Sequence, residues 1–90
     1  MKLHKLIDYI NEELEDAEKY AIACKVSEST EAKEIFKSLS AQELTHADKL
    51  RELMMKYVKE SDIRDHTVIA KFIYSSVSEK AEKIKSMLRD

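Results

Sequence analysis

Two residue types that shape most turns are missing from this chain of 90 residues: it contains no glycine and no proline. Hairpins and tight turns between strands depend on these residues, so their absence argues against a β or mixed fold. Cysteine occurs once, as Cys24, so the chain has no internal disulfide framework. These absences predict an all-α fold with short connections, formed by residues 1–90 as a single domain.

Strong charge of one sign and long apolar runs are missing as well. The formal net charge is −2 with both signs interspersed, so no basic surface for nucleic acid is expected. No apolar run approaches the roughly 20 residues that a membrane-spanning helix requires. Asp8, Asn11 and Glu12 interrupt the run after the basic start, which excludes the apolar segment of a signal peptide. We therefore expect a soluble, cytoplasmic protein with no nucleic-acid or membrane partner.

Apolar residues spaced three and four apart predict three amphipathic helices, at about 2–26, 31–59 and 62–89. The link between the first two is only a few residues long, so these helices should form an antiparallel hairpin. Ser29 or Thr30 is expected to cap the second helix. The third, C-terminal helix carries no Glu-x-x-His and is interpreted as a packing or assembly element.

The second helix has an unusual seam. Its predicted core-facing positions, read in alternating steps of three and four, are Ala32, Phe36, Leu39, Glu43, His46, Leu50, Leu53 and Tyr57. Glu43 and His46 lie one turn apart, so both side chains should reach the same point of a bundle interior. A buried carboxylate is costly unless it is paired or binds metal. The pair matches the Glu-x-x-His element of dimetal carboxylate sites in helical bundles.

A third ligand candidate comes from the first helix. The line Leu6, Glu13 and Tyr20 runs beside its apolar seam, which places Glu13 at the edge of the buried face. In an antiparallel hairpin that turns near residue 28, positions equally far from the turn lie at the same height. Glu43 is then level with Glu13, whereas the neighbouring acids, Glu12 among them, are interpreted as a solvated flank.

One chain therefore supplies half of a dimetal site. Such a site takes one Glu from each of two helices and a Glu-x-x-His from each of two others. A two-fold dimer of the hairpin would supply four Glu and two His, and symmetric dimers are the commonest oligomers. We predict that dimerisation completes a four-helix bundle, as a homodimer or a higher homo-oligomer.

The residues that carry a family resemblance are Glu12-Glu13-Leu14-Glu15, Tyr20, Phe36 and Glu43-x-x-His46-Ala47. Over about residues 6–55 the chain resembles the ferritin-like superfamily, which includes the rubrerythrins, and is most similar to the half-length encapsulated ferritins. The resemblance implies a di-iron centre between two subunits, with ferroxidase-type oxidation of Fe²⁺ for iron storage or detoxification. It implies Glu13, Glu43 and His46 as metal ligands and catalytic residues, and an encapsulin shell as partner and compartment.

The chain departs from that family at several places. Gln42 stands where an acidic residue is frequent, and Lys19 stands where Trp is frequent. The C-terminal residues 86–90 show no docking tail for an encapsulin shell. These departures concern iron access and cargo status, whereas the ligand set is complete.

Two other interpretations stay open from the residues alone. The chain could be a metal-binding bundle without turnover, since Zn²⁺ and other divalent metals also occupy such donor sets. It could instead be a structural bundle in which a buried Glu/His pair fixes the helix register. Metal content after loading with Fe²⁺ discriminates between a metal site and a structural pair.

Several remaining residues have ordinary structural interpretations. Tyr20 is expected in the core, with a hydroxyl that could reach a site carboxylate. Cys24 is a small core residue. The other assignments are solvent or helix ends for His4 and His66, gap-filling or surface positions for Met54 and Met55, and a cap on the third helix for Ser61 or Asp62.

Overall fold

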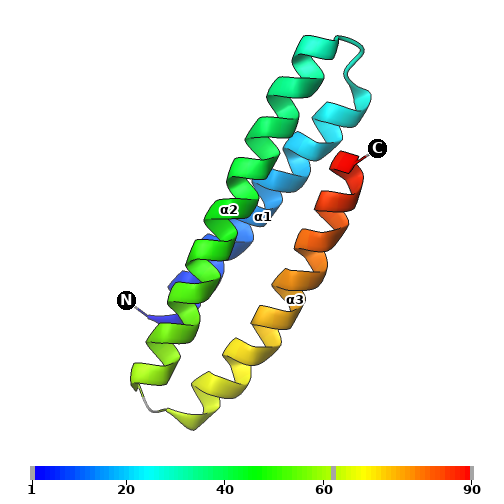
Figure 1. The fold of residues 1–90 in the computed structure, drawn as a ribbon. Coiled ribbons are helices and arrows are strands. Elements are labelled where there is room, and N and C mark those ends of the chain that lie inside the picture. Colours follow the sequence, from blue (N-terminus) through cyan, green and yellow to red (C-terminus); the bar gives the residue numbers. More distant parts are fainter. Residues whose placement is uncertain (1, 62, 90) are drawn as a thin grey trace.

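The computed structural model describes residues 2–61 and 63–89, which form three α-helices with no strand among them. α1 spans Leu3–Val26, α2 spans Thr30–Ser61 and α3 spans Arg64–Arg89. The helices lie side by side in an elongated bundle of 50 × 20 × 14 Å (Figure 1). The all-α prediction is confirmed, and the helix bounds differ from the predicted ones by at most two residues.

The chain runs up α1, down α2 and up α3, so α1 and α2 form the predicted antiparallel hairpin (Figure 1). α3 contacts both of the other helices. Within the described residues, no helix contains an apolar stretch that could cross a bilayer.

The apolar seam of α1 forms the centre of the core. Its buried residues are at most 7 % exposed and are Leu3, Leu6, Ile10, Leu14, Ala17 and Ala21. The spacing of apolar residues also predicts Ile7 and Cys24 on this face, and both are only partly buried. In the C-terminal helix the spacing of apolar residues predicts a buried line that begins at Ile63. Ala70, Val77, Ala81 and Ile84 of this line are buried, whereas Ile63 precedes α3 and is 48 % exposed.

The predicted core face of α2 is wrong by one residue. The buried residues of this helix are Ser40, Leu44, Ala47, Met54 and Val58, each directly following a position of the predicted seam. Successive helical residues differ by about 100° in direction, so the two stripes are neighbours on one helix. His46 and Leu53 of the predicted seam are exposed, and Met54, interpreted above as gap-filling or surface, is completely buried.

Arg51 is a charged residue within the buried stripe of α2. It lies between Ala47 and Met54, and a charge at this position argues against burial of the stripe. In the structure its guanidinium lies 4.3 Å from the centre of the Tyr74 ring and donates to Ser78 Oγ at 2.6 Å. These contacts, both with α3, stabilise a cation in a position that the sequence pattern assigns to an apolar residue.

The helix ends agree in part with the predicted caps. The backbone N–H of Ala32 donates to Ser29 Oγ at 3.2 Å, so Ser29 caps α2. Ser61 belongs to the end of α2, where its hydroxyl donates to the Val58 carbonyl at 3.0 Å, and it does not cap α3. Asp62, the other predicted cap, lies outside the described residues.

Candidate metal centre

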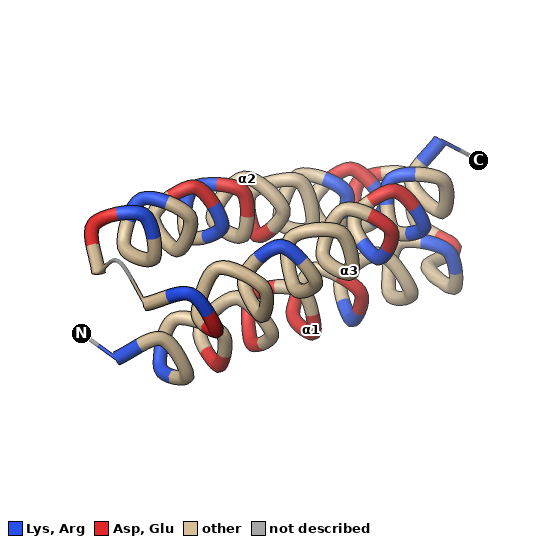
Figure 2. The backbone as a smooth tube through the Cα atoms, turned by 90° about the horizontal axis from the view of Figure 1, so that it is seen from below, with Lys and Arg blue, Asp and Glu red and all other residues tan. Residues whose placement is uncertain are grey.

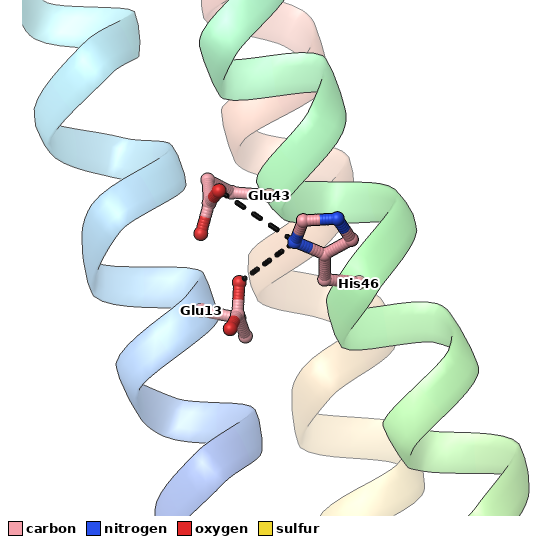
Figure 3. A group of neighbouring side chains, drawn as sticks. All are labelled: Glu13, Glu43 and His46. Atoms are coloured by element: carbon pink, nitrogen blue, oxygen red, sulfur yellow. Dashed lines mark hydrogen bonds and ion pairs between the residues drawn. The ribbon is translucent and has the colours of Figure 1, made fainter.

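Glu13, Glu43 and His46 meet between α1 and α2, at the height predicted from the hairpin turn (Figure 3). His46 Nδ1 lies 3.3 Å from Glu13 Oε2 and 3.6 Å from Glu43 Oε1. One ligand atom from each residue lies within 4.8 Å of the others. Among the described residues this is the one group of three or more ligand-type side chains brought together in this way.

Close contact between the two helices positions this group. The Ser40 hydroxyl donates to the Ala17 carbonyl at 2.6 Å, and both residues are completely buried. Ala47 is also buried, so small side chains separate α1 from α2 next to the donor group. This short separation allows a carboxylate of α1 to contact an imidazole of α2 directly.

The three donors lie on the side of the hairpin away from α3, which passes behind them in Figure 3. The side chain of Glu43 is 20 % exposed, that of Glu13 is 27 % exposed and that of His46 is 53 % exposed. The predicted bundle interior is that of a dimer, and within one chain these residues lie on an open face. The two carboxylates are largely covered, whereas the imidazole borders solvent.

The two carboxylates strongly affect each other. The pKa of Glu43 is raised from 4.5 to about 7, mainly because a hydrogen bond to Glu13 favours the protonated form. Partial burial and the negative charge of Glu13 add to this increase in pKa, while His46 opposes it. Two carboxylates held this closely share a proton, and a bound cation is the natural replacement for that proton.

Asp16 belongs to the surroundings of the site, although its sequence position suggested only a solvated flank. Its negative charge also raises the pKa of Glu43, and its side chain is only 50 % exposed. The signal was present in the spacing, because residues 13, 16 and 20 follow one side of α1 at helical intervals.

The donor set fits a divalent transition metal. Two carboxylates and one imidazole are the ligand types that bind iron, manganese or zinc in proteins. Three donors from one chain leave positions in a metal's coordination sphere for water, a substrate or further protein ligands.

The other residues singled out from the sequence lie outside this donor group. Tyr20 stacks on Phe36, with ring centroids 6.4 Å apart and an angle of 22° between the planes, and makes no hydrogen bond to a described carboxylate. Glu12 is exposed, and as the neighbour of Glu13 it points about 100° away from the direction of the donor group. His4 and His66 lie together at the far end of the bundle, where with Tyr57 they line a hollow of about 370 Å³.

Comparison with known proteins adds one positive result. The family model of rubrerythrin matches residues 6–90, which is nearly the whole chain. No curated protein matches the chain. No solved structure matches it either.

Proposed function

The chain belongs to the rubrerythrin family, and from this membership and the donor geometry we propose that it is a di-iron carboxylate protein with ferroxidase-type activity. The metal ligands in this proposal are Glu13, Glu43 and His46, each supplied by two copies of the chain. The observation that carries it is the convergence of three metal-binding side chains on a face that α3 leaves open.

Apolar residues around the donors support a second copy of the chain as the missing half. Leu53 is 46 % exposed and Tyr9 is 42 % exposed, while Leu39 and Leu50 on the same side of α2 are only half-buried. An exposed apolar surface that encloses polar ligands is typical of an interface. A two-fold dimer through this face would form a four-helix bundle and bring four carboxylates and two imidazoles together.

The side chains have distinct roles in this proposal. Glu43, with its pKa raised to about 7, releases its proton when a cation binds, and its carboxylate then becomes a ligand. Glu13 is the partner carboxylate from the opposite helix, and the His46 imidazole is a neutral nitrogen donor. Bound iron supplies one-electron transfer to oxygen or peroxide. The apolar interface of the dimer restricts water around the ligands.

Within the family, we propose that the half-length encapsulated ferritins are the nearest functional parallel, with an encapsulin shell as partner. The support is the thirty-residue step from Glu13 to Glu43 and the need for two subunits to complete one site. Gln42 and Lys19 differ from the frequent residues of that group, so iron access would follow a different surface.

The test combines iron oxidation with solution mass. Anaerobic loading with Fe²⁺ should give two iron ions per dimer, and oxygen should then produce the ultraviolet absorbance of ferric product. His46→Ala is the ligand variant, and Lys33→Ala, an exposed position near the hairpin turn, is its matched control. A monomer that binds two iron ions at full affinity would contradict the shared site.

A structural role is the second candidate, favoured by the direct contacts of His46 with Glu13 and Glu43 in one chain. In that case the three side chains would fix the register of α1 against α2 without metal. His46→Ala would then lower the stability of the metal-free protein, and Fe²⁺ would neither bind in pairs nor change the solution mass.

A further inference from the structure

Charge is unevenly distributed among the helices. α1 contains six acidic and three basic residues, a net charge of −3 with His neutral. α3 contains three acidic and six basic residues, a net charge of +3. Acidic residues recur along α1 in Figure 2, while basic residues are frequent along α3. The small total charge of the chain therefore conceals two oppositely charged helices.

Each of these two helices also exposes large apolar side chains on its outer side. On α1, Val26 is 73 % exposed and Ile22 is 49 % exposed. On α3, Phe72 is 71 % exposed and Val68 is 64 % exposed. We define the α1 stripe as Glu15, Lys19, Ile22 and Val26, and the α3 stripe as Val68, Phe72, Glu79 and Lys83.

The two stripes have matching spacing. From Val26 back to Lys19 and then Glu15, the steps are seven and four residues. Counted forward from Phe72, the same steps of seven and four residues reach Glu79 and Lys83. Steps of seven and four keep residues on one side of a helix, so each set forms a line.

Antiparallel alignment of the stripes gives three complementary contacts. Val26 then lies opposite Phe72, Lys19 opposite Glu79, and Glu15 opposite Lys83. Parallel alignment would place Glu15 opposite Glu79 and Lys19 opposite Lys83, which repel. The order of charges therefore selects one direction.

Within one chain, the charged residues of the two stripes form few ion pairs that association would have to break. Lys19 Nζ lies 4.0 Å from the Asp16 carboxylate, with 78 % of the lysine side chain exposed. Glu15, Glu79 and Lys83 are exposed and form no ion pair with any described residue.

We propose that the α1 stripe of one copy binds the α3 stripe of another copy in antiparallel orientation. The two stripes belong to different sides of one molecule, so the contact is heterologous and each copy uses both surfaces. Repetition of such a contact gives a ring or a chain of copies. The metal-centre face is a third surface, so this contact does not depend on iron and can link the proposed dimers into a larger assembly.

The contact should be modest in strength and sensitive to salt. Exposed ion pairs contribute little individually, and Phe72 with Val26 forms the apolar centre. Added salt screens the two charge pairs and should shift the assembly to lower mass. Two-fold dimers through the metal face would carry two copies of each stripe, which strengthens the assembly by multivalency.

The test measures solution mass against concentration for the metal-free full-length chain, by sedimentation. Phe72→Ser, Glu15→Lys and Lys83→Glu, each alone, should weaken association by about tenfold or more. Lys33→Glu is the matched control for a charge change outside both stripes, and it should leave association unchanged. Circular dichroism verifies that each variant keeps the helix content of the parent.

Mixing two defective variants gives the decisive result. Glu15→Lys places a cation opposite Lys83, and Lys83→Glu places an acid opposite Glu15, so each variant alone should associate more weakly than the parent. In an equal mixture every contact between unlike variants again joins opposite charges, and the parent mass distribution should return. The proposal is overturned if the parent shows one mass at all concentrations, if Phe72→Ser behaves as the parent, or if the mixture stays dissociated.

Discussion

The α1–α2 hairpin has two faces made from neighbouring stripes of the same helices, and only one of them is closed. On the closed face, Ile10 and Met54 are completely buried in the core cluster that includes residues of α3. On the open face, His46 is 53 % exposed and Leu53 is 46 % exposed. Both stripes have helical spacing and contain apolar and polar residues, so periodicity alone does not show which stripe is buried.

The difference between the faces shows where a small helical bundle can hold polar metal-binding side chains. Two carboxylates and an imidazole sealed under α3 would combine loss of hydration with repulsion between the acids. On the open face water remains in contact with His46, and the acids share a proton instead. The closed face therefore stabilises the chain, while the open face keeps the three polar side chains accessible.

The largest expected effect separates function from stability. Glu43→Ala and His46→Ala should each lower the rate of iron oxidation by more than about 100-fold, because even residues that only support metal ligands matter by 10–100-fold. The helix content of the metal-free protein should change little, since both residues lie on the open face. Stopped-flow absorbance and circular dichroism measure the two quantities. Parent oxidation rates in both variants would place the site elsewhere.

The second comparison uses adjacent acids on α1. Glu13 contacts His46, whereas Glu12 points to solvent. Glu13→Ala should therefore lower the oxidation rate by about 100-fold, while Glu12→Ala should leave it within about twofold, as expected for an exposed substitution. Equal losses would mean that Glu13 is not a ligand, although Glu43 and His46 could remain so.

A third comparison uses adjacent residues of α2 on the two faces. Met54→Ala should lower the free energy of unfolding by about 2–5 kcal/mol, because it opens a cavity in the closed core. Leu53→Ala should change it by less than about 0.5 kcal/mol in the monomer. Urea denaturation at low protein concentration measures both. Leu53→Ala should nevertheless weaken the proposed dimer, which sedimentation detects.

Much of the fold could be predicted from the sequence, because three helices and a short link leave few arrangements. The height of Glu13 against Glu43 followed from the hairpin turn and is confirmed by the contacts of His46. Which of the two stripes of α2 faces the core could not be predicted in the same way. Its two stripes have the same spacing and both contain polar residues: Glu43 and His46 on one, Ser40 and Arg51 on the other.

Contacts between distant parts of the chain decide between those stripes. Arg51 is tolerated in the closed face because its guanidinium pairs with Asp48 at 2.9 Å and also contacts Tyr74 and Ser78 of α3. Ser40 is tolerated because it donates to Ala17 of α1. The partners on α1 and α3 are not visible in the local periodicity of α2. The influence of Asp16 on Glu43 also arises across the two helices, although the spacing of residues 13, 16 and 20 places Asp16 on the same side of α1 as Glu13.

The smallest expected effect is a dependence of stability on pH that belongs to the open face. The pKa of Glu43 is about 7 in the folded chain, against an ordinary value of 4.5. Between these values the folded state binds a proton that the unfolded state has lost, so the stability gained from protonation is complete below pH 4.5 and is lost as pH rises to 7. The free energy of unfolding of the metal-free protein should fall across this window by roughly 1–3 kcal/mol.

Two variants assign this pH dependence to the correct face. Glu43→Gln carries a neutral amide at every pH, so it should remove most of the slope and raise stability above pH 7. Met54→Ala should displace the whole curve downward by a constant amount, because neither the buried methionine nor the alanine ionises. Urea denaturation at intervals from pH 4 to 8 measures both curves. A slope that persists in Glu43→Gln would mean that the shared proton is not held between Glu13 and Glu43.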